Sequence, residues 1–168
     1  ESYKKALKVT YKVESWESEM LRANVLNNMG VTYVNLGNYE MAESHAIASM
    51  EQKKKLGQES SIGYSFQLMA ESAIGRSKFD LALKYLEQSD KKFQILNNQD
   101  EIDKNQFLRA KSYLAIGKNE TALTAVGQIN FGLTVFFACC SVFRLFSGFF
   151  TFFSFAVSHA MTERRIIT

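Results

Sequence analysis

The sequence predicts an all-α fold, an α-solenoid of stacked helix pairs in residues 1–128, followed by an apolar C-terminal segment at 129–168. Three observations lead to this prediction. Alanine recurs at the evenly spaced positions 42, 82 and 122, and an internal period of this size is typical of repeat architectures. A helix-ending turn precedes each of these alanines. The 168 residues include no proline, so long helices can run between the turns.

Each turn combines the end of one helix with the start of the next. Gly37 and Gly117 stand where a helix must end, and glycine adopts the left-handed conformation of such an end at little cost. Asn38 and Ser77 can accept hydrogen bonds from the free N–H groups at the start of the following helix. We expect the alanine that follows to be small because two helices approach closely there.

Apolar residues between the turns recur at three- and four-residue steps, which is the period of amphipathic helices. Leu26, Met29 and Tyr33 follow this step before the first turn, as do Leu83 and Leu86 after the second. We therefore expect residues 1–15 to be the second helix of a preceding repeat. Three helix pairs are predicted to follow, at 20–36 with 39–56, 60–76 with 79–97, and 101–116 with 119–128.

These residues resemble the tetratricopeptide family, whose repeat sets large apolar residues, a glycine turn, an aromatic residue and an alanine in a fixed order. The matching residues are Leu26, Met29, Gly30, Tyr33, Gly37, Tyr39 and Ala42, then Phe66, Met69, Ala70, Phe79 and Ala82, then Ala110, Tyr113, Gly117 and Ala122. The third repeat departs from the pattern, with Gln106 and Arg109 in place of apolar residues. The period set by the alanines exceeds the common length of about 34 residues. In this respect the chain resembles long-repeat bacterial signalling proteins, including peptide-sensing regulators of Gram-positive bacteria and sensor proteins with output domains.

The resemblance implies a groove, lined by the first helix of each pair, that binds a protein or peptide. Counted from the matched positions, its residues are Asn24, Asn27, Val31 and Asn35, then Tyr64, Gln67 and Glu71, then Lys104, Phe107 and Lys111. Amide groups can bind a peptide backbone, and the two aromatic rings would be apolar anchors. The alternative is that these side chains merely face water. The family's clamp for peptide C-termini needs Lys and Asn where this chain has Asn27 and Val31, which argues against that mode.

No motif for catalysis is found, and we expect no enzyme activity, cofactor or metal. His45 and His159 are the only histidines, and neither has a companion at the spacing of metal ligands. Only three of the 20 Lys/Arg and one of the 17 Asp/Glu lie after residue 128. The repeat region is therefore nearly neutral, which argues against a nucleic-acid surface. The basic run at 53–55 is expected to be a solvated helix end.

The composition changes near residue 129. Residues 131–158 hold 10 of the 14 phenylalanines and a single charge, Arg144, and this stretch is long enough to cross a bilayer. Three interpretations are open. The segment is a membrane span with a cytoplasmic C-terminus at Arg164 and Arg165, or a non-native tail from a truncated or out-of-frame extension, or a hairpin near Gly148 that packs on the end of the solenoid.

The functional prediction is a non-catalytic scaffold that binds a protein or peptide within a larger bacterial signalling or assembly protein. The sequence opens at Glu1 without a starting Met, so we expect a segment of a longer chain. The alternatives are the sensor part of a membrane-anchored signalling enzyme and a fragment of a peptide-responsive transcription regulator. The expected location is cytoplasmic, or membrane-anchored if 131–158 spans a bilayer. The partner and the oligomeric state do not follow from these patterns.

Overall fold

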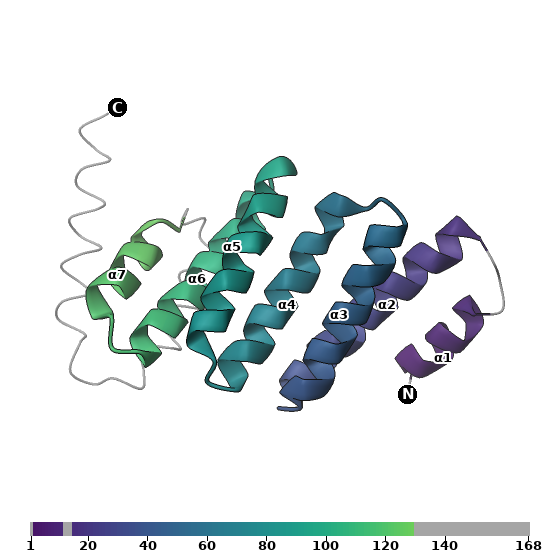
Figure 1. Ribbon diagram of the computed structural model, residues 1–168, viewed down its shortest axis with the longest axis horizontal. Coiled ribbons are helices and arrows are strands. Elements are labelled where there is room, and N and C mark those ends of the chain that lie inside the picture. Colours follow the sequence, from purple (N-terminus) through teal and green to yellow (C-terminus); the bar gives the residue numbers. More distant parts are fainter. Residues whose placement is uncertain (1, 12–14, 130–168) are drawn as a thin grey trace. The chain divides into compact units, whose positions relative to one another are not determined.

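The computed structural model describes residues 2–11 and 15–129, all of which belong to one compact unit (Figure 1). This described part holds seven α-helices and no strand, which confirms the all-α prediction. A short 3-10 helix, η1 at Glu59–Ser61, precedes α4. The α-helices are α1 (Ser2–Thr10), α2 (Trp16–Asn35), α3 (Tyr39–Lys55), α4 (Ile62–Gly75), α5 (Phe79–Ile95), α6 (Gln99–Ala115) and α7 (Asn119–Gly127).

The helix boundaries agree with the sequence prediction except near the N-terminus. Helices α3 to α7 begin and end within two residues of the predicted positions. The helix predicted over residues 1–15 is present but shorter, because α1 ends at Thr10, and α2 begins at Trp16 where residue 20 was predicted. The cause is Ser15, whose side chain accepts a hydrogen bond from the backbone N–H of Ser18 at 3.2 Å and so starts α2 ahead of the predicted position.

Five turns at even intervals end successive helices. The residue at each turn has a positive φ, and these residues are Gly37 (73°), Gly57 (69°), Ser77 (58°), Asn97 (51°) and Gly117 (77°). At the first turn the N–H of Gly37 donates to the carbonyl of Val34, and the N–H of Asn38 donates to that of Tyr33, each at 2.9 Å. These bonds satisfy carbonyls that the end of α2 leaves without helical partners. One helix with one left-handed turn is therefore half of a repeat.

The two predicted helix caps have different outcomes. Asn38 caps α3 as predicted, because its side chain accepts from the N–H of Met41 at 3.2 Å. The prediction for Ser77 is wrong. Ser77 occupies the left-handed position that ends α4, and the residue before α5 is Lys78, which makes no side-chain cap. Ser77 thus stands at the position that glycine holds in the first turn, one residue before a cap.

Close helix contacts explain the regularly recurring alanines. Ala42 and Ala82 are 0% exposed and Ala122 is 1% exposed. The approach is also close at Gly30 on α2, where an added Cβ would lie 3.2 Å from the backbone oxygen of Ala42 on α3 and 2.5 Å from the Cδ2 atom of Leu68 on α4. Larger side chains would force the helices apart, so small residues are required at these positions.

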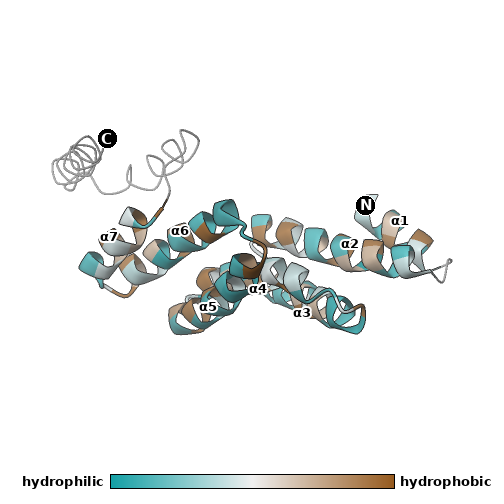
Figure 2. Ribbon diagram, turned by 90° about the horizontal axis from the view of Figure 1, so that it is seen from above, coloured by the Kyte–Doolittle hydropathy of each residue, from teal (hydrophilic) through white to brown (hydrophobic). Residues whose placement is uncertain are grey.

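Adjacent helices pack in a repeating pattern. Helix α2 contacts α3, α4 contacts α5, and α6 contacts α7, which gives the predicted pairs. Helix α4 also contacts α3, α2 and α6, so neighbouring pairs meet through their first helices as well as through a first and a second helix. In Figure 2, α3 and α5 lie on one side of this region and α2 and α6 on the other. The packing is consistent with a helical repeat.

The basic run at 53–55 differs from its prediction. Lys54 and Lys55 are exposed as expected, but Lys53 is only 2% exposed. Its Nζ atom donates to the carbonyl of Ser61 at 3.2 Å and lies 6.0 Å from the centre of the Tyr64 ring. Burial lowers the pKa of Lys53 to about 8. The prediction of a solvated run is therefore wrong for Lys53, because η1 and the start of α4 pack over its side chain.

The predictions for the C-terminal segment, including the span at 131–158, fall outside the described residues. Within 2–11 and 15–129, no helix combines the length and the apolar character that crossing a membrane requires. Ile129, the last described residue, is 1% exposed.

Candidate binding face

The predicted groove residues lie on α2, α4 and α6 and are related by the repeat. Three sets are equivalent, namely Asn24 with Tyr64 and Lys104, Asn27 with Gln67 and Phe107, and Val31 with Glu71 and Lys111. Because α4 contacts both α2 and α6, the helix with the middle residue of each set lies between the other two. We call these nine positions and Asn35 the binding face. Within each helix their spacing of three to four residues places them on one side.

The part of the face on α2 is largely open to solvent. Asn24 and Asn35 are exposed, and Val31 is 40% exposed. Asn27 is half-buried, and its Oδ1 atom lies 3.3 Å from the hydroxyl of Ser65 on α4. Helix α2 thus offers three side chains to a partner, while the fourth is tied to the next helix pair.

Asn27 belongs to a buried polar junction between the first two pairs. Ser49 on α3 donates to the carbonyl of Ala23 on α2 at 2.8 Å. The hydroxyl of Ser65 lies 3.4 Å from that of Ser49 and also within reach of Asn27. Ser49 and Ser65 are both 0% exposed. We call Ala23, Asn27, Ser49 and Ser65 the first junction.

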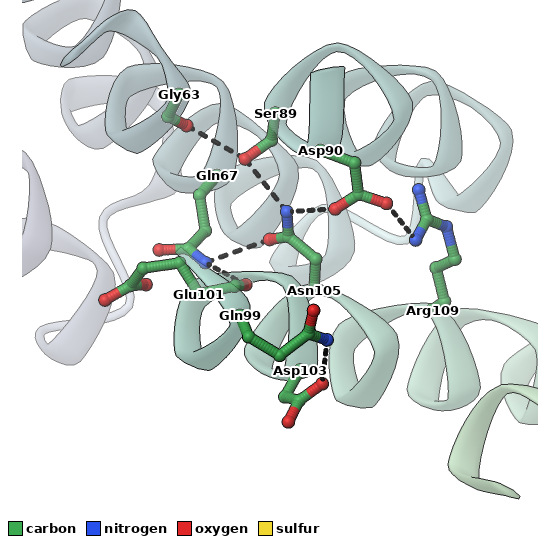
Figure 3. A network of polar contacts seen from close by, with 9 residues as sticks. All are labelled: Gly63, Gln67, Ser89, Asp90, Gln99, Glu101, Asp103, Asn105 and Arg109. Carbon is green, nitrogen blue, oxygen red and sulfur yellow. Dashed lines mark hydrogen bonds and ion pairs between the residues drawn. The ribbon is translucent and has the colours of Figure 1, made fainter. Parts of the chain in front are cut away.

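The same arrangement recurs one repeat later (Figure 3). Ser89 on α5 donates to the carbonyl of Gly63 at 2.9 Å, and the amide nitrogen of Asn105 on α6 donates to Ser89 at 2.9 Å. Gln67 on α4 donates through Nε2 to Oδ1 of Asn105 at 2.9 Å. Gly63, Gln67, Ser89 and Asn105 form the second junction, and each stands one full repeat after its counterpart in the first.

An ion pair sets the direction of the hydrogen bonds in the second junction. Asp90 pairs with Arg109, and Asn105 donates to the carboxylate of Asp90 at 2.6 Å. A carboxylate only accepts, so the amide group of Asn105 must turn its nitrogen to Asp90 and its oxygen to Gln67. Gln67 then donates, and its own oxygen points away from Asn105 (Figure 3). Among the residues that the structure describes, none donates to this oxygen.

Arg109 thereby has a structural explanation. The repeat pattern predicted an apolar residue at position 109. In the structure its guanidinium pairs with Asp90, and both side chains are mostly buried, with 16% and 13% of their surfaces exposed. The charge is accommodated because the pair also anchors the amide of Asn105.

Tyr64 is held in place by its surroundings. Its ring meets the ring of Phe93 edge-on, with 4.9 Å between the centroids, and its hydroxyl accepts from the side-chain nitrogen of Asn98 at 3.2 Å. Lys53 also lies near the ring, at the position that is equivalent to Phe93 one repeat earlier. The half-buried Tyr64 thus contributes to packing at the ends of α3 and α5 as well as to the binding face.

Charged side chains gather between α4 and α6. Glu71 is half-buried, and burial raises its pKa above the ordinary value. Lys111 and Lys104 act in the opposite direction, and Glu101 adds to the increase. Lys104 pairs with Glu101 at 2.7 Å and keeps 63% of its side chain exposed. Lys111 is exposed and Phe107 half-buried, so the part of the face on α6 combines apolar surface with positive charge.

Apart from Asn27 and Gln67, the junction residues were not singled out from the sequence. Ser49, Ser89 and Asn105 are polar residues within helices, and such residues are usually on the surface. A signal was present nonetheless, since Ser49 and Ser89 are separated by the period of the alanines. That period could have marked both serines as inward-facing.

Neither the protein-family models, nor the curated proteins, nor the solved structures include a match to this chain. Over the described residues, no group of three or more His, Cys, Asp or Glu side chains is placed to hold a metal ion.

Proposed function

We propose that residues 2–129 form a tetratricopeptide-like α-solenoid that binds a protein or peptide on the binding face without catalysing a reaction. The observation that supports it most is the recurrence of one hydrogen-bond pattern at two consecutive junctions, with every participant displaced by one repeat. A repeated junction repeats the orientation of one helix pair on the next, which is how a solenoid is built.

The face has the chemistry that an extended peptide needs. Asn24 and Asn35 are exposed amides that can both donate and accept, and Val31 supplies apolar surface. Gln67 adds an acceptor whose direction is set by the second junction. A peptide backbone alternates donors and acceptors, so ordered side chains of both kinds can bind it with little loss of conformational freedom.

The experiment is a selection of displayed nine-residue peptides on the full chain, followed by affinity measurements on the selected peptides. The test variant is Val31→Arg, which places a long side chain on the binding face. The matched control is Ile47→Arg on α3, because Ile47 is 36% exposed and Val31 is 40% exposed. Circular dichroism melting verifies that both variants fold.

We expect Val31→Arg to weaken binding about tenfold or more, since a misplaced charge in an interface costs more than about 1 kcal/mol. Ile47→Arg should leave the affinity nearly unchanged. Peptides that bind both variants as well as the original chain would show that the binding face lies elsewhere and would overturn the proposal.

A further inference from the structure

Glu71 is the acidic group of the binding face that lacks a partner. Its side chain is half-buried on α4, and it forms no hydrogen bond or ion pair with any residue in the described ranges. Glu101, the other carboxylate nearby, already pairs with Lys104. A carboxylate that has lost water without gaining a partner is poorly stabilised in its charged form.

The neighbouring lysines do not fully stabilise the charged form of Glu71. Lys111 and Lys104 both favour the charged form of Glu71, but burial outweighs them and the pKa stays raised. Lys111 is exposed and Lys104 is directed to Glu101. Both ammonium groups keep much of their hydration, and solvated charges exert only a weak attraction.

A second acceptor lies one helical turn away. Gln67 precedes Glu71 by four residues, and residues at this spacing are neighbours on the surface of a helix. The oxygen of Gln67 receives no hydrogen bond within the described part of the chain, and its direction is set by Asn105. One face of α4 therefore presents a carboxylate and an amide oxygen side by side, both without donors.

We propose that Glu71 and Gln67 form a binding site for a cationic side chain of the bound peptide, and that arginine fits it best. The inference rests on the proposed function and specifies its ligand. Arginine carries five N–H donors in a planar fork, so it can pair with the carboxylate and still donate to the amide oxygen. Lysine would satisfy the charge with fewer directed bonds. An acidic peptide side chain would pair with Lys111, which is exposed to solvent, so this ion pair would contribute less to the binding free energy.

The experiment repeats the peptide selection with the full chain and three variants. Glu71→Gln removes the charge and keeps the shape. Glu71→Lys reverses the charge. Glu51→Gln on α3 is the matched control, because Glu51 is exposed and does not belong to the binding face. Deep sequencing of the selected peptides gives the residue preference at each position.

With the original chain and with Glu51→Gln, we expect one peptide position to be enriched in arginine. Glu71→Gln should lose that enrichment and bind the arginine peptides about tenfold less tightly, since a charge-assisted pair contributes more than a neutral bond. Glu71→Lys, if it folds, should enrich aspartate or glutamate at the same position.

The outcomes separate this inference from the proposed function. Selected peptides that bind Val31→Arg less tightly but have no basic position overturn the Glu71–Gln67 site and leave the binding face standing. The same holds if their basic position persists with Glu71→Gln. Peptides that are insensitive to Val31→Arg overturn both. Arginine enrichment that disappears with Glu71→Gln supports both.

Discussion

Replacing Lys53 by methionine should stabilise the protein at neutral pH. Lys53 is 2% exposed, and its Nζ donates to one carbonyl, that of Ser61. Methionine has nearly the same length and no charge. The equivalent position in the next repeat holds Phe93, which is 0% exposed, so the surroundings accept an apolar side chain.

The magnitude follows from the pKa. Burial lowers the pKa of Lys53 from 10.5 to about 8, and one pKa unit corresponds to about 1.4 kcal/mol, so holding the ammonium in the folded state costs about 3 kcal/mol. The bond to Ser61 returns about 1 kcal/mol when it is kept. We therefore expect Lys53→Met to raise the free energy of unfolding by about 2 kcal/mol at pH 7.

The pH dependence has a defined sign. Below pH 8 Lys53 is protonated in both the folded and the unfolded state, and the folded state bears the full cost. Between pH 8 and 10.5 the folded state has lost the proton while the unfolded state still holds it, so stability rises with pH. The advantage of Lys53→Met should therefore shrink across this window.

The assay is urea unfolding of the full chain, followed by circular dichroism at pH 7, 8.5 and 10. The control is Lys54→Met, which changes an exposed neighbour and should leave stability nearly unaltered at every pH. Taking the difference between each variant and the original chain cancels the titration of the other groups. A Lys53→Met protein that is less stable at pH 7, or an advantage that does not vary with pH, would refute the reasoning.

Three further predictions concern the turns, the junctions and the close helix contacts. Ser77→Gly should stabilise the chain by about 1 kcal/mol in urea unfolding, because glycine adopts the φ of 58° without strain; no gain would contradict the left-handed turn. Asn105→Ala should lower the free energy of unfolding by about 2–4 kcal/mol, since it leaves Asp90, Ser89 and Gln67 without a shared partner. Ser65→Ala at the equivalent position should lower it by about 1 kcal/mol. Equal effects in urea unfolding would argue against the ion pair of Asp90 and Arg109 as the anchor of Asn105. Ala82→Trp should destabilise the chain through overpacking by about 1–3 kcal/mol or more, which is seen as a lower melting temperature. Lys84→Trp should not, because Lys84 is exposed on the same helix. An unchanged melting temperature of Ala82→Trp would contradict the close contact.

Helix ends could be predicted where the residues that make them are neighbours in sequence. Gly37 and Gly117 end helices through bonds to carbonyls a few residues away, so the local sequence suffices. The turn at Ser77 was also predicted, but Ser77 was assigned the cap and not the left-handed position, because serine is more familiar as a cap. The even spacing of all five turns was obscured by the mixture of glycine, serine and asparagine.

The predicted groove residues fall on the first helices of the three pairs, as the repeat count expected. Counting from the matched glycines and alanines located Asn27, Gln67 and Phe107 at equivalent positions on α2, α4 and α6. The sequence could not predict which of these side chains form hydrogen bonds within the protein. The partners of Asn27 and Gln67 lie 38 residues away, at Ser65 and Asn105. Whether the face binds a ligand remains a prediction.

The sequence by itself determined that the repeat region is helical, where most of its helices begin and end, and that Ala42, Ala82 and Ala122 are buried, because these properties depend on residue spacing and on nearby backbone groups. Only the tertiary structure decided that Lys53 is buried, that Arg109 pairs with Asp90, and that Glu71 lacks a partner in the described part of the chain. Burial and pairing depend on side chains that come together across separate helices. Their effect on a charge is set by how much water those helices exclude.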